Sequence, residues 1–168
     1  MAIDILKQFA VFVALCLAQA LVFNQIHLFG CAIPLLYVYF AIIFPRNYPK
    51  WAILLWAFML GLLVDTFSNT PGLAAASLTL IAAIQPYLFE LLVPRDSAEN
   101  LKPSLSTLGT MKYTYYIIIL VLLYCVVFYS LELFSFFNLM QWALCIGGST
   151  AITLLLIFTF EIAKANRS

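Results

Sequence analysis

Apolar runs about as long as a membrane is thick recur from one end of this chain to the other. A hydrocarbon core about 30 Å thick needs roughly 20 apolar residues for each helical crossing. Hydrophobic residues make up 65% of the 168 positions, and the chain has only eight basic and seven acidic side chains. A soluble domain devotes about a quarter of its residues to charge. We therefore expect a single integral membrane domain over residues 1–168, folded as an all-α, polytopic membrane helix bundle.

Breaks in the apolar pattern divide the chain into about six transmembrane helices. Prolines, glycines and short polar groups mark most of these breaks, and the longest polar stretch is a predicted cytoplasmic loop at residues 94–112. No small-residue cleavage site follows the first run, so we expect that run to be a retained helix. The predicted spans cover residues 5–23, 30–44, 51–67, 73–93, 113–134 and 139–162.

The basic residues predict the orientation of the bundle. With six spans, all eight fall on one side of the membrane, near the amino end, in two connections and in the tail. The positive-inside rule makes that side cytoplasmic, so we expect both termini to be cytoplasmic. The residues are Lys7, Arg46, Lys50, Arg95, Lys102, Lys112, Lys164 and Arg167.

Few residues in the chain could support catalysis or metal binding. The single histidine and the widely spaced cysteines form no cluster with metal-ligand spacing. The sequence contains no glycine-rich phosphate loop and no assembled Ser-His-Asp set, and a net charge of +1 gives no nucleic-acid footprint. We expect no enzymatic activity, no metal, no cofactor and no nucleic acid. Cys16, Cys31, Cys125 and Cys145 are interpreted as small packing residues.

Small residues recur at four-residue spacing in the first and last predicted spans, which places each set on one helix face. Such faces let helix backbones approach each other closely in a membrane. We expect them to pack within the chain, and the alternative is that they receive an external partner. They are Ala10, Ala14 and Ala18 in the first span, and Gly147 with Ala151 and Ser149 with Thr153 in the last.

Most of the acidic residues are predicted to lie where a charge costs little. Glu132 is expected at the outer surface, and five others at span ends or in cytoplasmic loops: Asp4, Glu90, Asp96, Glu99 and Glu161. Asp65 differs, because a rise of 1.5 Å per residue from the start of its span places it about 21 Å into the bilayer. A mid-helix Asp costs roughly 2.5 to 3.5 kcal/mol on insertion scales, so Asp65 should face the bundle or a wet cavity.

Gly61 and Asn69 lie four residues to either side of Asp65, so the three residues share one face of a continuous helix. Two interpretations of this face stay open. Asp65 could cap the amino end of the next helix, near Gly72 or Leu73, through free amides and the helix dipole. Alternatively, the three residues could form a contact with a partner or an outward-facing pocket.

The same stretch carries a resemblance to a known family. "GLLVDTFSNTPGLAAASLTLIAAIQPYL", residues 61–88, resembles the signature of the rod shape-determining protein MreD family, in which a Gly-x-x-x-Asp helix leads through a short polar turn into a Gly-Leu-rich helix. Gln19 and "HLFGCAIPLLYVYFAII", with Gly30 and Pro34, match the family's usual opening. The likeness covers about residues 19–88, while the second half is generic apolar helix.

The resemblance implies a multi-pass protein of the bacterial inner membrane. It would be a scaffold of the elongasome, the machinery that builds lateral peptidoglycan and maintains cell shape. Its direct partner would be the bitopic protein MreC, with links to the MreB filament and to the glycan polymerase and transpeptidase pair. The fold would be similar to the membrane-embedded substrate-binding subunits of energy-coupling-factor transporters. The alternative function is therefore a vitamin-type binding subunit of such a transporter.

Overall fold

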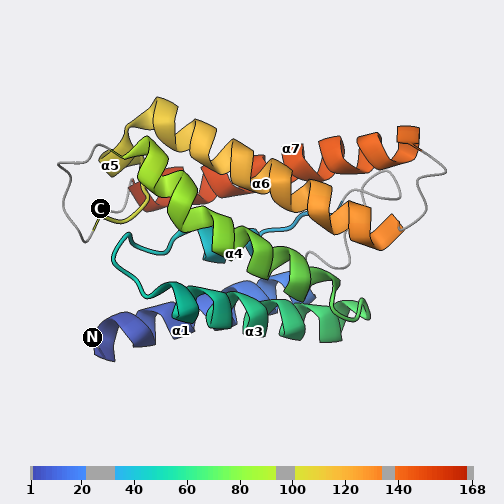
Figure 1. Ribbon diagram of the computed structural model, residues 1–168, viewed down its shortest axis with the longest axis horizontal. Coiled ribbons are helices and arrows are strands. Elements are labelled where there is room, and N and C mark those ends of the chain that lie inside the picture. The colour runs from blue at the N-terminus through green and yellow to red at the C-terminus, as the bar shows by residue number, and fades with distance from the viewer. Residues whose placement is uncertain (1, 22–32, 94–100, 134–138, 166–168) are drawn as a thin grey trace.

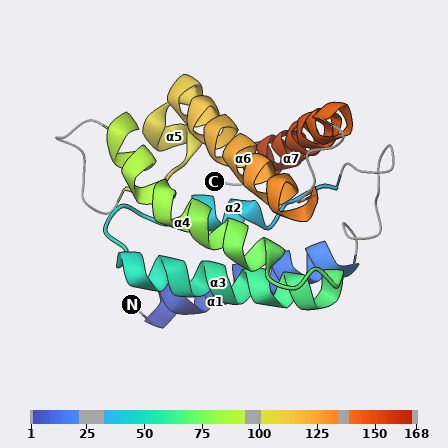
Figure 2. The same ribbon diagram turned by 45° about the vertical axis from the view of Figure 1, so that its right-hand side comes forward.

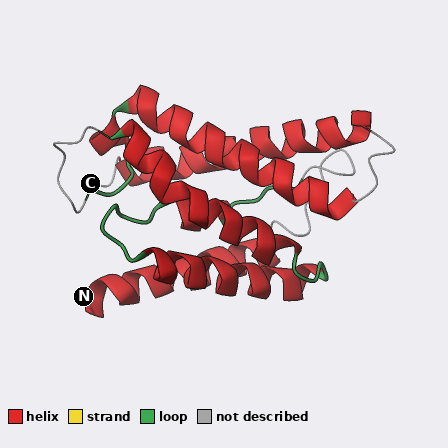
Figure 3. Ribbon diagram, in the orientation of Figure 1, coloured by secondary structure: helices red, strands yellow, loops and turns green. Residues whose placement is uncertain are grey.

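The computed structural model describes residues 2–21, 33–93, 101–133 and 139–165, and all regular structure in these ranges is helical (Figure 3). Four of the described helices are long and apolar enough to cross a membrane, namely α3, α4, α6 and α7, and α1 contributes a shorter apolar stretch, Leu6–Leu21. In chain order the helices are α1 (Ala2–Leu21), α2 (Val38–Ile42), α3 (Lys50–Ser68), α4 (Leu73–Leu92), α5 (Leu105–Leu108), α6 (Thr110–Leu133) and α7 (Leu139–Ala165).

The long helices form a bundle in which α4 lies between two pairs (Figures 1 and 2). On one side of α4 lie α1 and α3, and on the other side lie α6 and α7. The amino end of α1, the carboxyl end of α7, the connection before α3 and the short helix α5 all lie at the same end of the bundle, on the left in Figure 1. The turn between α3 and α4 lies at the opposite end.

The segment predicted as a second spanning helix is mostly not helical, which corrects the expectation for residues 30–44. Within residues 33–44 only α2 is helical, and residues 30–32 lie outside the described ranges. The segment runs through the centre of the bundle (Figure 2) and is almost entirely buried, with Phe40 and Phe44 fully inaccessible. Its apolar composition therefore reflects enclosure by protein.

Aromatic rings anchor this central segment to its neighbours. The Phe40 ring lies 5.7 Å from Phe12 of α1 and 5.1 Å from Phe44, both in edge-on geometry. Trp56 of α3 lies 5.5 Å from Phe12, also edge-on. Edge-to-face pairs add about 0.5–1.5 kcal/mol beyond burial, so the cluster ties α1, α2 and α3 together.

Buried polar side chains satisfy the backbone of the first half of the central segment. The Gln19 side-chain amide donates to the Pro34 carbonyl at 3.0 Å. The amide N–H of Leu35 donates to the Thr153 hydroxyl at 3.0 Å, and that of Ile33 donates to Ser149 at 3.1 Å. Irregular backbone at membrane depth is tolerated only where such partners exist. The helices around the segment thus supply the hydrogen bonds that a helix would supply internally.

The second half of the segment is held in the same way from α4 and α6. Gln85 donates to the Phe44 carbonyl at 3.3 Å and to the Tyr116 hydroxyl at 2.8 Å. Tyr116 in turn donates to the Ile42 carbonyl at 3.3 Å. Gln85 and Tyr116 are both buried. An amide in the middle of an apolar helix is costly in a bilayer unless it is paired, and here its partners explain its position.

Candidate functional site

Gly61 lies where α3 and α4 touch through their backbones. A Cβ atom added at this glycine would lie 2.3 Å from the Cα of Ala75 and 2.6 Å from its nitrogen. The atoms in the way belong to backbone, so a rotamer change cannot relieve the clash. Close approach of this kind is the role that small residues play between membrane helices. Position 61 therefore requires glycine.

One turn further along α3, Asp65 caps the amino end of α4. Its Oδ1 accepts the backbone N–H of Ala74 at 2.8 Å and the Thr70 hydroxyl at 3.0 Å, and its Oδ2 accepts the N–H of Ala75 at 2.9 Å. The first amides of a helix have no partner within the helix, and a negative charge there is favoured by the helix dipole. The side chain is only 4% exposed. The geometry is that of the capping interpretation, with both carboxylate oxygens in use.

Asn69 does not share the buried face of Gly61 and Asp65, which corrects that expectation. It adopts a left-handed conformation, with φ of +56°, and its N–H bonds to the Asp65 carbonyl to end α3. The side chain is exposed. Because the chain leaves the helix at Asn69, the four-residue spacing no longer predicts the direction of its side chain. Gly72, with φ of +85°, then opens α4, where glycine avoids the strain of a positive φ.

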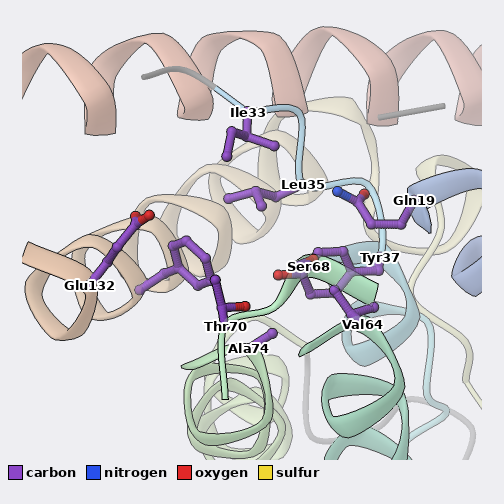
Figure 4. A pocket seen from close by; sticks show the side chains of 10 residues that line it. Gln19, Ile33, Leu35, Tyr37, Val64, Ser68, Thr70, Ala74 and Glu132 are labelled. Carbon is purple, nitrogen blue, oxygen red and sulfur yellow. The ribbon is translucent and has the colours of Figure 1, made fainter. Parts of the chain in front are cut away.

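A cavity of about 270 Å³ lies beside this turn (Figure 4). Its walls come from the carboxyl end of α1, the start of the central segment, the α3–α4 turn and the carboxyl end of α6, so it sits at the end of the bundle away from the chain termini. The lining is half polar and half apolar: Gln19, Ile33, Leu35, Tyr37, Val64, Ser68, Thr70, Ala74, Phe128 and Glu132.

The small-residue faces behave differently from the expectation of packing within the chain. Ala10 and Ala14 on α1 and Gly147 and Ala151 on α7 are exposed, and Ala18 is partly buried. A Cβ added at Gly147 would meet no atom within 4 Å. Packing within the chain is therefore wrong for the four exposed positions. The neighbouring face of α7, with Ser149 and Thr153, is fully buried and bonds the central segment.

Glu161 was predicted to lie at a span end where a charge costs little free energy, but its side chain is buried. It is only 3% exposed, and the Tyr39 hydroxyl donates to its Oε2 at 2.6 Å. The central segment brings Tyr39 against α7, and a sequence pattern cannot foresee that contact. The signal that could have marked Gln85 and Glu161 is a polar side chain with apolar neighbours on both sides along a helix.

The three cysteines that the structure describes divide into two groups. Cys16 and Cys125 are buried and free, as expected of packing residues. Cys145 forms a disulfide, which corrects the expectation for that residue. Cys31 lies outside the described residues.

The part of the chain that the structure describes contains no group of three or more metal-ligating side chains. No protein-family model matches the chain, and the comparisons with curated proteins and with solved structures find no match. The family resemblance of residues 61–88 therefore stays a prediction.

Proposed function

We propose that this protein is a non-enzymatic membrane scaffold of the bacterial cell-elongation machinery. It would assemble directly with MreC, and through it with the MreB filament and the proteins of lateral peptidoglycan synthesis. The observation that carries the proposal is the α3–α4 hairpin. Gly61 and Asp65 form the Gly-x-x-x-Asp motif of the family resemblance, and both have structural roles that depend on their own residue types.

The proposal includes a six-crossing topology in the inner membrane, with both termini in the cytoplasm. The central segment would be the second crossing, enclosed by the helices rather than facing lipid. The described basic residues belong to helix segments and connections that meet at one end of the bundle, which the positive-inside rule favours as cytoplasmic. They are Lys7, Arg46, Lys50, Lys102, Lys112 and Lys164. The disulfide at Cys145 lies toward the opposite end and fits an oxidising compartment outside the cytoplasm.

The cavity beside the α3–α4 turn supports the vitamin-binding alternative, because it would open outward in this topology. Pockets for drug-sized ligands occupy about 300–1,000 Å³, and the cavity at about 270 Å³ falls below that range. The cavity is therefore at the small end for a ligand site. Exposed small-residue positions on α1 and α7 offer surfaces on which other membrane helices could pack closely.

The two functions are separated by what the protein retains on purification. The affinity-tagged chain would be extracted from native bacterial membranes in mild detergent, with an unrelated bitopic membrane protein expressed at the same level as the control. Immunoblotting would detect MreC, and mass spectrometry of the small-molecule extract would detect vitamins. We expect retention of MreC and no vitamin. Retention of a vitamin without MreC would favour the transporter subunit and contradict the scaffold.

A further inference from the structure

We propose that the cavity beside the α3–α4 turn binds a lysine or arginine side chain from the partner segment just outside the partner's membrane helix. The inference rests on the proposed function, because it needs a bitopic partner that leaves the membrane at this end of the bundle. Three properties of the cavity point to this occupant: its hydrogen-bonding groups, its charge and its size.

The hydrogen-bonding groups of the cavity wall favour a ligand that donates. The Thr70 hydroxyl and the N–H of Ala74 are already committed to Asp65, and the N–H of Leu35 is committed to a hydroxyl of α7. The Oε1 of Gln19 has no hydrogen-bond partner among the residues that the structure describes, although this residue is only 1% exposed. A buried acceptor without a donor costs free energy. A phosphate or carboxylate ligand would add acceptors where donors are needed.

The charge of the lining favours a cation. Glu132, at the exposed carboxyl end of α6, supplies a carboxylate, and none of the lining residues that the structure describes is lysine, arginine or histidine. Asp65 adds a second carboxylate immediately behind Thr70. Described basic residues such as Lys50 and Lys112 belong to the opposite end of the bundle. A hollow with low-dielectric walls and one sign of charge concentrates the opposite charge.

The size and shape of the cavity fit one long side chain. A volume of about 270 Å³ is ample for one lysine or arginine side chain. Ile33, Leu35 and Val64 lie around the hollow (Figure 4) and, with Phe128, would contact the methylene stem, while Gln19 Oε1 and Glu132 would attract the charged head. Long basic side chains commonly bury their stems along apolar surface in this way.

The test measures the affinity of the purified chain for full-length MreC, with both proteins reconstituted in lipid nanodiscs. Two variants change the cavity charge, Glu132→Gln and Glu132→Lys. Glu90→Gln is the matched control, because Glu90 is exposed in the last turn of α4 and lies away from the cavity. We expect Glu132→Lys to raise the Kd about tenfold or more, as loss of a close interfacial charge pair does. Glu132→Gln should have a smaller effect in the same direction, and the control should bind like wild type.

A charge exchange then tests whether the occupant is a basic side chain. Each lysine and arginine just outside the MreC membrane helix is replaced in turn by glutamate, and one replacement should restore binding to Glu132→Lys. Wild-type affinity of Glu132→Lys, or no restoring replacement, would overturn the inference while leaving the scaffold intact. Failure of the wild-type chain to bind MreC would overturn both. Binding of n-butylammonium to the chain alone, with a Kd below about 1 mM, would assign the cavity to a free amine instead.

Discussion

Replacing Asp65 with asparagine should destabilise the protein, although asparagine is as good a helix cap as aspartate in ordinary N-cap positions. The reason is that the two carboxylate oxygens accept from two different amides, Ala74 at 2.8 Å and Ala75 at 2.9 Å. An asparagine side chain offers one oxygen and turns its NH₂ group toward the other N–H. One buried amide is then left without an acceptor.

The expected loss follows from these contacts. An orphaned buried N–H costs about 1–3 kcal/mol, and removing a negative charge from a helix amino end costs about 0.3–1 kcal/mol. Relief of the desolvation cost of the charge does not offset this loss, because the side chain lies within the membrane in the unpacked state as well. Asp65→Asn should lower the free energy of unfolding by about 1–4 kcal/mol.

The assay is reversible unfolding of the purified protein in mixed micelles, titrated with a denaturing detergent and followed by circular dichroism. Glu90→Gln makes the same chemical change at an exposed position and should leave the free energy of unfolding within about 0.5 kcal/mol of wild type. If Asp65→Asn were equally silent, the two-oxygen cap would not contribute to stability, and the structural account of the motif would fail.

Three further changes test the fold and its orientation. Gly61→Ala should cost about 3 kcal/mol, the upper end of the usual range for overpacking, in the same unfolding assay, since its Cβ would meet the Ala75 backbone at 2.3 Å, and wild-type stability would refute the contact between α3 and α4. Thr153→Val keeps the shape but removes the acceptor of the Leu35 N–H, so it should cost about 1–3 kcal/mol, and a neutral result would mean that the central segment does not depend on this bond. A reporter inserted at Asn69 should signal the exterior and one fused at Ser97 the cytoplasm, and an exterior signal at Ser97 would refute the six-crossing topology.

The sequence alone predicted the long helices and the place of the acidic residue between them. Apolar runs bounded by Pro, Gly and short polar groups located α3, α4, α6 and α7, because helix length in a membrane depends on bilayer thickness. The Gly-x-x-x-Asp spacing also identified Gly61 and Asp65 as facing a neighbour. Both features are local, so a pattern along the chain is enough to find them.

The central segment and the outcome for Asn69 could not be predicted in this way. Residues 33–44 are as apolar as a spanning helix, and their irregular backbone depends on hydrogen bonds from Gln85, Ser149 and Thr153, which are distant in sequence. Packing of the central segment against α7 also brings Tyr39 to the buried Glu161. At Asn69 the helical period was extended one residue too far, past the point at which the chain adopts a left-handed conformation.

Site-specific photo-crosslinking in living bacteria tests the scaffold most directly. The described basic residues belong to the opposite end of the bundle, so lysine-reactive reagents are unsuited to the α3–α4 turn, and a photoreactive amino acid at exposed Asn69 reaches it instead. The same amino acid at exposed Lys112, in the first turn of α6, is the control for the other end. We predict that irradiation links position 69 to the MreC segment just outside its membrane helix. Absence of that link, with the main crosslink instead joining position 112 to an ATP-driven coupling protein, would contradict the scaffold and favour a transporter subunit.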